Sequence, residues 1–228
     1  MIPRELIATA KVPGGAELRL FRRGRDHMIV LDRNELMNSR MSGSEEALAT
    51  MTAERLAGRK SQHWLVGGYG MGFTLRAALG ALGSDARLTV AELVREIIDW
   101  ARGPMAELCA GCLDDRRVRI VEGDVAAMIE AARSDYDAIL LDVDNGPDGL
   151  SRAANNRLYN PFGLEAARAA LKPGGVLAIW SAADDKAFAR KLERAGFSVE
   201  EVAVRARSNG KGPRHIIWFA TRRGQDRR

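Results

Sequence analysis

The chain has 228 residues, of which 46% are hydrophobic and 29% charged, and this length and composition suit one soluble α/β domain with a small appendage. No stretch is long and apolar enough to span a bilayer, so we expect no membrane partner. The formal net charge of +5 indicates nucleic-acid binding only weakly, because the arginines are dispersed and no aromatic residues alternate with them.

The N-terminal segment has the alternating pattern of a small β region. Residues 17–22 alternate polar and apolar side chains, and after a turn residues 27–31 form a second strand. A third short strand is expected near residues 35–38. The segment lacks the apolar core of a signal peptide, which predicts a cytoplasmic location. We expect a small N-terminal β region over residues 1–42 and a larger domain over residues 43–228.

A helix is expected next, over residues 45–56, with a serine as its N-cap. Its apolar residues recur at helical spacing and predict a buried stripe: Ala47, Leu48, Met51 and Leu56. The charged residues at its start, Arg40, Glu45 and Glu46, have two interpretations: contacts to a bound acceptor or solvated charges of the helix start. We favour the second.

A glycine-rich turn, residues 67–72, follows a short apolar strand and opens a helix that runs from Phe73 to Leu82. Glycine lets the backbone turn tightly and lets a ligand approach closely. The helix N-terminus directs free N–H groups at the same ligand. This pattern predicts a nucleotide-type site, although the spacing serves NAD, FAD and adenosyl sulfonium compounds alike.

Three later strands also end in acidic residues. Glu92 ends the strand that starts at residue 86, Asp124 follows the strand at residues 118–122, and Asp142 follows the strand at residues 137–141. The alternation of strands and helices predicts a parallel sheet with right-handed crossovers. Parallel strands bring their carboxyl ends to one edge, where open α/β sheets bind ligands. We therefore expect these carboxylates beside the glycine turn.

The remaining segments complete an α/β domain. A loop rich in Asp, Asn and Gly covers residues 143–160, a length that is usually functional or mobile in a compact domain. Helices and one strand follow, and residues 197–205 and 215–221 predict an antiparallel hairpin at the sheet edge. Cys109 and Cys112 have no histidines at ligand spacing, so we expect two reduced thiols and no metal.

Three stretches carry a resemblance to a known family: LVGGYGMG; the run from Glu92 through GPMAELCAGCLDDRRVRIVEGD; and YDAILLDVDNGP followed by LYNPFGLEAARAALKPGGVLAIW. They resemble the class I S-adenosylmethionine-dependent methyltransferase fold and, within it, the spermidine synthases, which are aminopropyltransferases. The resemblance implies a Rossmann-like, mostly parallel seven-stranded sheet with an antiparallel C-terminal hairpin. It also implies a small N-terminal β domain and a homodimer.

The resemblance further implies roles for the predicted site residues. The glycines and the acidic strand end would hold the donor, S-adenosylmethionine or its decarboxylated form, together with two apolar neighbours: Gly67, Gly68, Gly70, Gly72, Glu92, Leu93, Asp124 and Val125. Glu92 would accept both ribose hydroxyls. Asp124 would accept from the adenine amino group, with the N-cap of the next helix as the alternative. Asp142 would be the general base or charge stabiliser, with a loop-start hydrogen bond as the alternative.

The sequence departs from the family in its acceptor site. The family has two aspartates spaced D-x-x-D after the fourth strand, whereas here Asp142 matches the first position, Asn145 occupies the second and Asp144 is displaced by one. We include Asp144, Asn145 and Tyr159 as second-rank acceptor contacts. A polyamine is a dication that needs several carboxylates, so these departures weigh against diamine binding.

Three hypotheses follow. The first is methyl transfer from S-adenosylmethionine to a small-molecule acceptor such as an amine. The alternative is a polyamine aminopropyltransferase that uses decarboxylated S-adenosylmethionine. The third is a non-catalytic relative that binds an adenosyl nucleoside or nucleic acid; the retained Glu92 and Asp124 argue against it.

Overall fold

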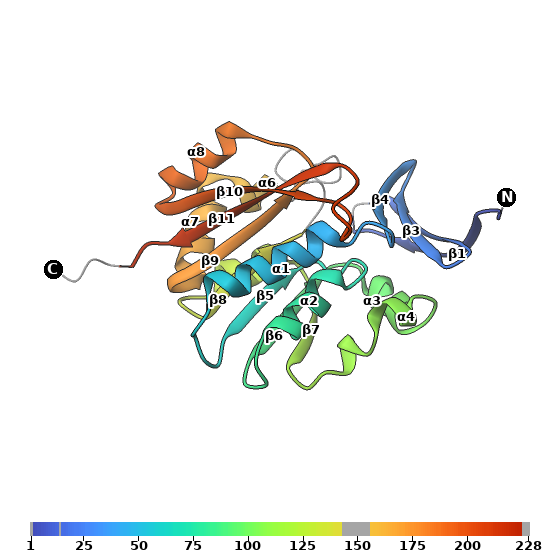
Figure 1. Cartoon of the computed structure of the whole chain (residues 1–228), viewed down its shortest axis with the longest axis horizontal. Helices are drawn as coiled ribbons and strands as arrows, with labels where there is room; N and C mark the ends of the chain where they lie inside the picture. Colours follow the sequence, from blue (N-terminus) through green and yellow to red (C-terminus); the bar gives the residue numbers. More distant parts are fainter. Residues whose placement is uncertain (1, 14, 143–155, 225–228) are drawn as a thin grey trace.

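The computed structural model describes residues 2–13, 15–142 and 156–224, which form two β-sheets and their covering helices (Figure 1). The smaller sheet has four antiparallel strands in the order β1-β2-β3-β4. Its strands are β1 (Glu5–Lys11), β2 (Glu17–Arg23), β3 (Asp26–Leu31) and β4 (Asn34–Asn38). The predicted N-terminal β region is thus confirmed, with one strand, β1, that the sequence pattern did not indicate.

The larger sheet has seven strands in the order β10-β11-β9-β8-β5-β6-β7. Its strands are β5 (His63–Gly67), β6 (Arg87–Glu92), β7 (Val118–Glu122), β8 (Tyr136–Leu141), β9 (Leu171–Ser181), β10 (Phe197–Arg205) and β11 (Arg214–Arg222). Strands β5 to β9 pair in parallel, and β11 is antiparallel to both of its neighbours. This is the predicted Rossmann-like sheet with an antiparallel C-terminal hairpin.

Helices cover both faces of the larger sheet, and Figure 1 shows α1 lying across one of them. The helices are α1 (Gly43–Arg55), α2 (Phe73–Ala81), α3 (Arg95–Arg102), α4 (Ala106–Cys109), the short 3₁₀ turn Cys112–Asp114, α5 (Val125–Ala131), α6 (Asn156–Tyr159), α7 (Pro161–Ala170) and α8 (Lys186–Arg194). No helix in these described segments is long and apolar enough to cross a membrane.

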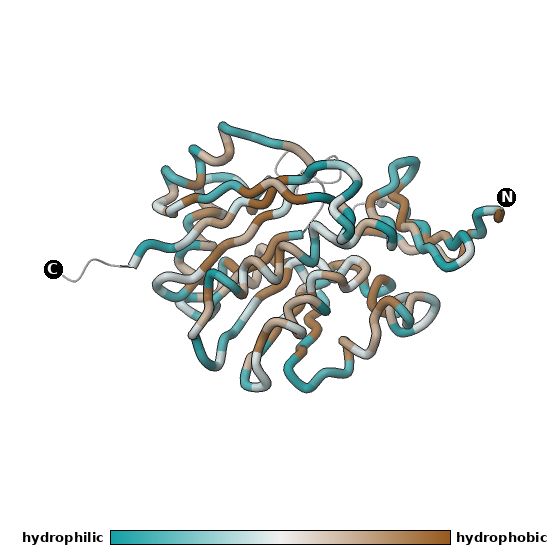
Figure 2. Tube along the Cα trace, in the orientation of Figure 1, coloured by the Kyte–Doolittle hydropathy of each residue, from teal (hydrophilic) through white to brown (hydrophobic). Residues whose placement is uncertain are grey.

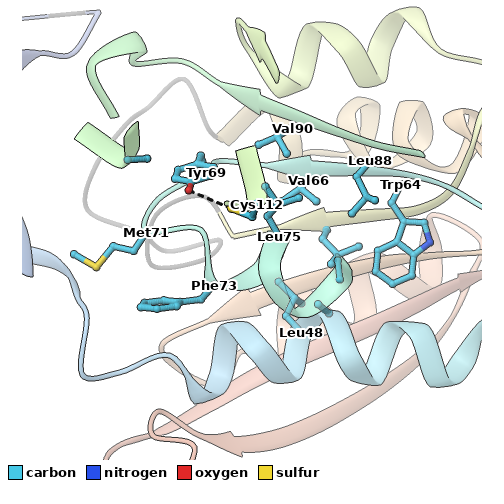
Figure 3. Packing of buried hydrophobic residues seen from close by; sticks show 14 of the residues in the cluster. Leu48, Trp64, Val66, Tyr69, Met71, Phe73, Leu75, Leu88, Val90 and Cys112 are labelled. Carbon is cyan, nitrogen blue, oxygen red and sulfur yellow. Dashed lines mark hydrogen bonds between the residues drawn. The ribbon is translucent and has the colours of Figure 1, made fainter. Parts of the chain in front are cut away.

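The alternation of side chains along each strand divides the core in two. Trp64 and Val66 of β5 join the cluster beneath α1 and α2, whereas Leu65 joins the cluster beneath α5, α7 and α8. Figure 3 shows part of the first cluster, with Leu48 of α1 and Leu75 of α2 packed against the strands. Figure 2 shows that hydrophobic residues concentrate on the strands of this sheet. Burial on both faces makes the sheet a rigid platform for its loops.

The buried face of α1 differs from the predicted stripe. The fully buried residues are Ser44, Leu48, Ala49 and Thr52, while Ala47 and Met51 are only half-buried. The helix lies between α2 and the strands of the C-terminal hairpin. The face that it buries between them is therefore rotated about the helix axis relative to the predicted apolar stripe. As a result, residues of its first turn face the interior.

An ion-pair cluster joins the strands at the sheet edge opposite their carboxyl ends. Asp137 of β8, only 4% exposed, accepts hydrogen bonds from Lys172 Nζ at 2.7 Å, the His63 backbone N–H at 2.9 Å and Arg59 Nη1 at 3.0 Å. Burial alone would raise the pKa of Asp137, but these three bonds lower it below its ordinary value. The cluster connects β5, β8 and β9 with the segment after α1.

Candidate active site

The turn between β5 and α2 requires glycine, because neighbouring side chains leave no room for a Cβ. At Gly67 a Cβ would lie 2.9 Å from Leu141 Cδ2 and 3.1 Å from Val125 Cγ2. Gly72 has φ +80°, and a Cβ there would lie 2.6 Å from the Tyr69 hydroxyl oxygen. Gly72 is also the N-cap of α2, where it has no side chain to occupy the helix N-terminus. The turn therefore keeps the backbone N–H groups of α2 accessible to a ligand.

Glu92 ends β6 beside this turn and is held by the backbone. Its Oε2 accepts the Tyr69 N–H at 2.8 Å, and its Oε1 accepts the Val94 N–H at 2.9 Å. The residue is 6% exposed, and burial raises its pKa although these bonds favour the ionised form. Each carboxylate oxygen has a second lone pair. Leu93 lies half-buried next to it. Ribose recognition by Glu92 remains a prediction, and the orientation of the carboxylate is compatible with it.

Asp124 is the N-cap of α5, which was the alternative to its predicted adenine contact. Its Oδ1 accepts the Ala126 N–H at 2.8 Å. Its Oδ2 accepts Arg157 Nη2 at 2.8 Å, which joins the end of β7 to α6. Val125, the next residue, is buried against Gly67. The adenine contact of Asp124 stays a prediction.

A cavity of about 200 Å³ opens between the glycine turn, β4, α1 and the ends of β8, β9 and β11. Its polar lining comprises Glu35, Asn38, Glu45, Tyr69, Asp142 and His215. Its apolar lining includes Met37, Met41, Met71, Phe73 and Trp180. Figure 3 shows Met71 and Phe73 at the turn. The volume is below the roughly 300–1,000 Å³ of pockets for drug-sized ligands, which indicates a site for a small molecule.

Two carboxyl groups meet in this cavity. Asp142, at the end of β8, accepts Thr74 Oγ1 at 3.1 Å. Burial raises the pKa of Asp142 to about 6, and burial together with the neighbouring Asp142 raises the pKa of Glu45 to about 8. Two like charges so close cannot both ionise without cost, so the pair holds a proton near neutral pH. The favoured interpretation of Glu45 as a solvated helix-start charge is thus wrong.

The other predicted acceptor residues lie elsewhere. Asp144 and Asn145 are outside the described residues. Tyr159 of α6 is 4% exposed and packs edge-on against Phe188 at 5.7 Å between ring centroids, in the cluster beneath α7 and α8. Arg40 donates to Oδ1 of Asn38, a lining residue, and pairs with Asp26 at 3.6 Å, but Arg40 itself does not line the cavity.

The two cysteines lie beneath the glycine turn as free, buried thiols. Their Sγ atoms are 3.5 Å apart, and the Tyr69 hydroxyl is 3.5 Å from Cys112 Sγ (Figure 3). Burial raises the pKa of the Cys112 thiol to about 12. In the part of the chain that the structure describes, no three His, Cys, Asp or Glu side chains gather as a metal site.

Most side chains of the cavity were not among the predicted site residues, and three of them come from strands distant in the sequence. Glu35 comes from β4, His215 from β11 and Trp180 from β9. They belong to strands distant in sequence from the glycine turn, and only the folded chain brings them to it. Glu45 is different, because its spacing from Leu48, Ala49 and Thr52 follows one helical face and could have indicated burial.

Comparison with known proteins places these observations in a family. Residues 45–192 match the model of the spermine/spermidine synthase domain. Polyamine aminopropyltransferase 2 of Pseudomonas aeruginosa is 34% identical over 139 residues, which cover 56% of this chain and 38% of that protein. Putrescine N-methyltransferase 2 of Nicotiana attenuata is 37% identical over 114 residues, 50% of this chain and 29% of that protein. The chain thus aligns with between 29% and 38% of the length of these two relatives.

Solved structures agree on the fold. A spermidine synthase in complex with the transition-state analogue AdoDATO superposes with a TM-score of 0.74 at 19% identity, covering 95% of this chain and 72% of that one. Spermidine synthase from Thermotoga maritima gives the same TM-score at 17% identity and the same coverage. A domain match over more than half of the chain, with this fold, shows the family: the chain belongs to the spermine/spermidine synthase domain family.

Proposed function

We propose that the chain transfers an aminopropyl group from decarboxylated S-adenosylmethionine to a small amine. The observation that carries the proposal is the gathering of Asp142, Glu45 and Glu35 around one cavity beside the glycine turn. A small cavity with three carboxyl groups favours a cationic ligand. The relatives named polyamine aminopropyltransferase support the same reaction.

The residues at the carboxyl edge of the sheet fit an adenosyl donor. The Glu92 carboxylate is oriented by backbone N–H groups of the glycine turn and of the residues that follow it, and a carboxylate at this strand end suits the ribose hydroxyls. The N-terminus of α2 and the glycines 67, 68, 70 and 72 allow close approach of the chain that carries the sulfur. The donor supplies a carbon activated by its bond to a sulfonium. The protein aligns that carbon with the acceptor and excludes water.

Asp142 is the proposed general base for the acceptor. A polyamine nitrogen is protonated near neutral pH and must lose a proton before it can attack. Burial raises the pKa of Asp142 to about 6, which brings it closer to that of a base working near neutrality. Thr74 orients the carboxylate from the first turn of α2.

The test is an assay of the purified protein with putrescine and each of two donors, decarboxylated and intact S-adenosylmethionine. Aminopropyl transfer predicts spermidine and methylthioadenosine from the decarboxylated donor. Formation of N-methylputrescine and adenosylhomocysteine from the intact donor would instead support the methyl-transfer hypothesis, which the relatives named putrescine N-methyltransferase keep open. Absence of any product with both donors, tested with several diamines, would refute the proposal.

The division of the chain is also a proposal. We infer that residues 1–42 form a separate small β unit and residues 43–228 an adenosyl-sulfonium-binding domain. The separate hydrogen-bonded sheet β1–β4 supports this division. Glu35 of β4 nevertheless lines the cavity together with Glu45 of α1, so both units would contribute to the acceptor site. A homodimer, which the family resemblance implies, and a cytoplasmic location, which the N-terminal sequence predicts, remain further proposals.

A further inference from the structure

A continuous hydrogen-bond chain leads from the carboxyl pair to the C-terminal hairpin. Ser44 Oγ lies 2.8 Å from Glu45 Oε2, and His215 Nδ1 lies 3.0 Å from the same Ser44 Oγ. Ser44 is completely buried, so its hydroxyl has these two groups as neighbours and no access to bulk solvent. The Trp180 ring contacts the His215 imidazole edge-on at 4.7 Å between centroids and limits its rotation.

The chain can carry hydrogen bonds in either direction with the same atom positions. A hydroxyl donates one hydrogen bond and accepts others, and each imidazole nitrogen can be donor or acceptor. When Glu45 is ionised, His215 donates to Ser44 and Ser44 donates to Glu45. When Glu45 is protonated, Glu45 donates to Ser44 and Ser44 donates to His215 Nδ1. A reversal of this kind moves a proton from the carboxyl group to the imidazole.

From this geometry we infer that Ser44 and His215 act through Glu45 as a relay that removes the proton released by the acceptor amine. The inference rests on the proposed transfer reaction. The ammonium of the acceptor gives one proton to the Asp142–Glu45 pair and becomes a neutral amine. Its nitrogen then forms a bond to the sulfonium-bound carbon, and the carbon–sulfur electron pair leaves with the sulfur as a neutral thioether. The proton passes from Glu45 through Ser44 to His215 and on to solvent.

Ser44 and His215 are thus positioning residues, while Asp142 and Glu45 face the acceptor. The titratable groups around Glu45 are Asp142 at the end of β8, Glu46 on α1, Glu35 on β4, Tyr69 in the glycine turn and His215 on β11. Among the described residues, the Ser44 hydroxyl connects Glu45 to one titratable group of this cavity, His215.

The first test compares Ser44→Ala and His215→Gln with wild type in the transfer assay, using Ser42→Ala as the matched control. Ser42 is two residues away and makes no side-chain cap bond within the described segments. The relay predicts a turnover roughly 10- to 100-fold lower in both relay variants, with donor affinity unchanged. It also predicts that the acidic limb of the pH–rate profile moves to higher pH in Ser44→Ala, because the hydrogen bond that favours ionised Glu45 is lost. Wild-type rates and profiles in both variants would overturn the inference.

A second measurement separates failure of the relay from failure of the proposed function, because it needs no turnover. NMR titration of the His215 ring, assigned with His215→Gln, is recorded for wild type and for Glu45→Gln. Coupling through Ser44 predicts a second step in the His215 ring signals of wild type near pH 8, where Glu45 ionises and His215 Nδ1 changes from acceptor to donor. Glu45→Gln should lack this step. An identical titration in both proteins would overturn the relay even in an inactive protein. An inactive wild type with a coupled His215 would instead count against the transfer reaction alone.

Discussion

The carboxyl pair in the cavity predicts that the protein becomes less stable as the pH rises through neutrality. Burial and the neighbouring Asp142 raise the pKa of Glu45 from 4.5 to about 8. Above about pH 6, where Asp142 is ionised, and up to about pH 8, the folded protein therefore holds up to one more proton than the unfolded chain. In that interval the free energy of unfolding falls with rising pH, by up to about 1.4 kcal/mol per pH unit.

The interval between pH 7 and 8 separates this effect from that of the histidines. Burial lowers the pKa of His27, His63 and His215, so these histidines stabilise the folded protein with rising pH only up to their unfolded pKa near 6.5. Above pH 7 they are neutral in both states. A single group with a pKa of about 8 then predicts a loss of roughly 1 kcal/mol between pH 7 and 8.

Urea unfolding followed by circular dichroism at several pH values measures this slope. Glu45→Gln keeps the side-chain size but cannot ionise, so its stability should change little over the same interval. Glu46→Gln, the same substitution at the next residue of α1, should keep the wild-type slope. The reasoning is wrong if the wild-type free energy of unfolding is flat or rises from pH 7 to 8, or if Glu45→Gln falls as steeply as wild type.

Three further substitutions test the platform and the donor site. Asp137→Asn should lower the free energy of unfolding by roughly 2–3 kcal/mol, because Lys172 and Arg59 lose a buried counter-charge. Urea unfolding measures this loss of stability. Gly72→Ala should reduce donor affinity and thermal stability, because the backbone has φ +80° and a Cβ would overlap the Tyr69 hydroxyl. Glu92→Ala should weaken binding of an adenosyl donor by about 1–3 kcal/mol in calorimetric titration, and unchanged affinity would remove Glu92 from the site.

The sheet and its functional edge could be predicted from the sequence because both follow from local patterns. Each parallel strand is an apolar run, and its end is marked by the residue that follows the run: Glu92, Asp124 or Asp142. Parallel pairing then requires these ends to lie on one edge, whatever the details of packing. The cap bond of Asp124 is equally local, since it joins residues two apart.

The cavity could not be predicted in the same way, because its walls come from segments that meet only in three dimensions. Glu35 lies on an antiparallel strand of the smaller sheet and His215 on the last strand of the larger one. No spacing in the sequence connects them to the glycine turn. Glu45 was misjudged for a different reason: a charge beside a helix start is usually solvated, and here the adjacent cavity is what makes it functional.

The same cavity bears on the doubt that the sequence raised about an amine acceptor. The family's second aspartate is replaced by Asn145, which suggested that too few carboxylates remained for a cation. Glu45 and Glu35 bring two carboxyl groups to the cavity from α1 and β4, elements that the motif does not include. A cation responds to the number and proximity of negative charges around it, and not to the strand that supplies them. Loss of one motif position is therefore compatible with an amine acceptor, whose binding would then depend on Glu45.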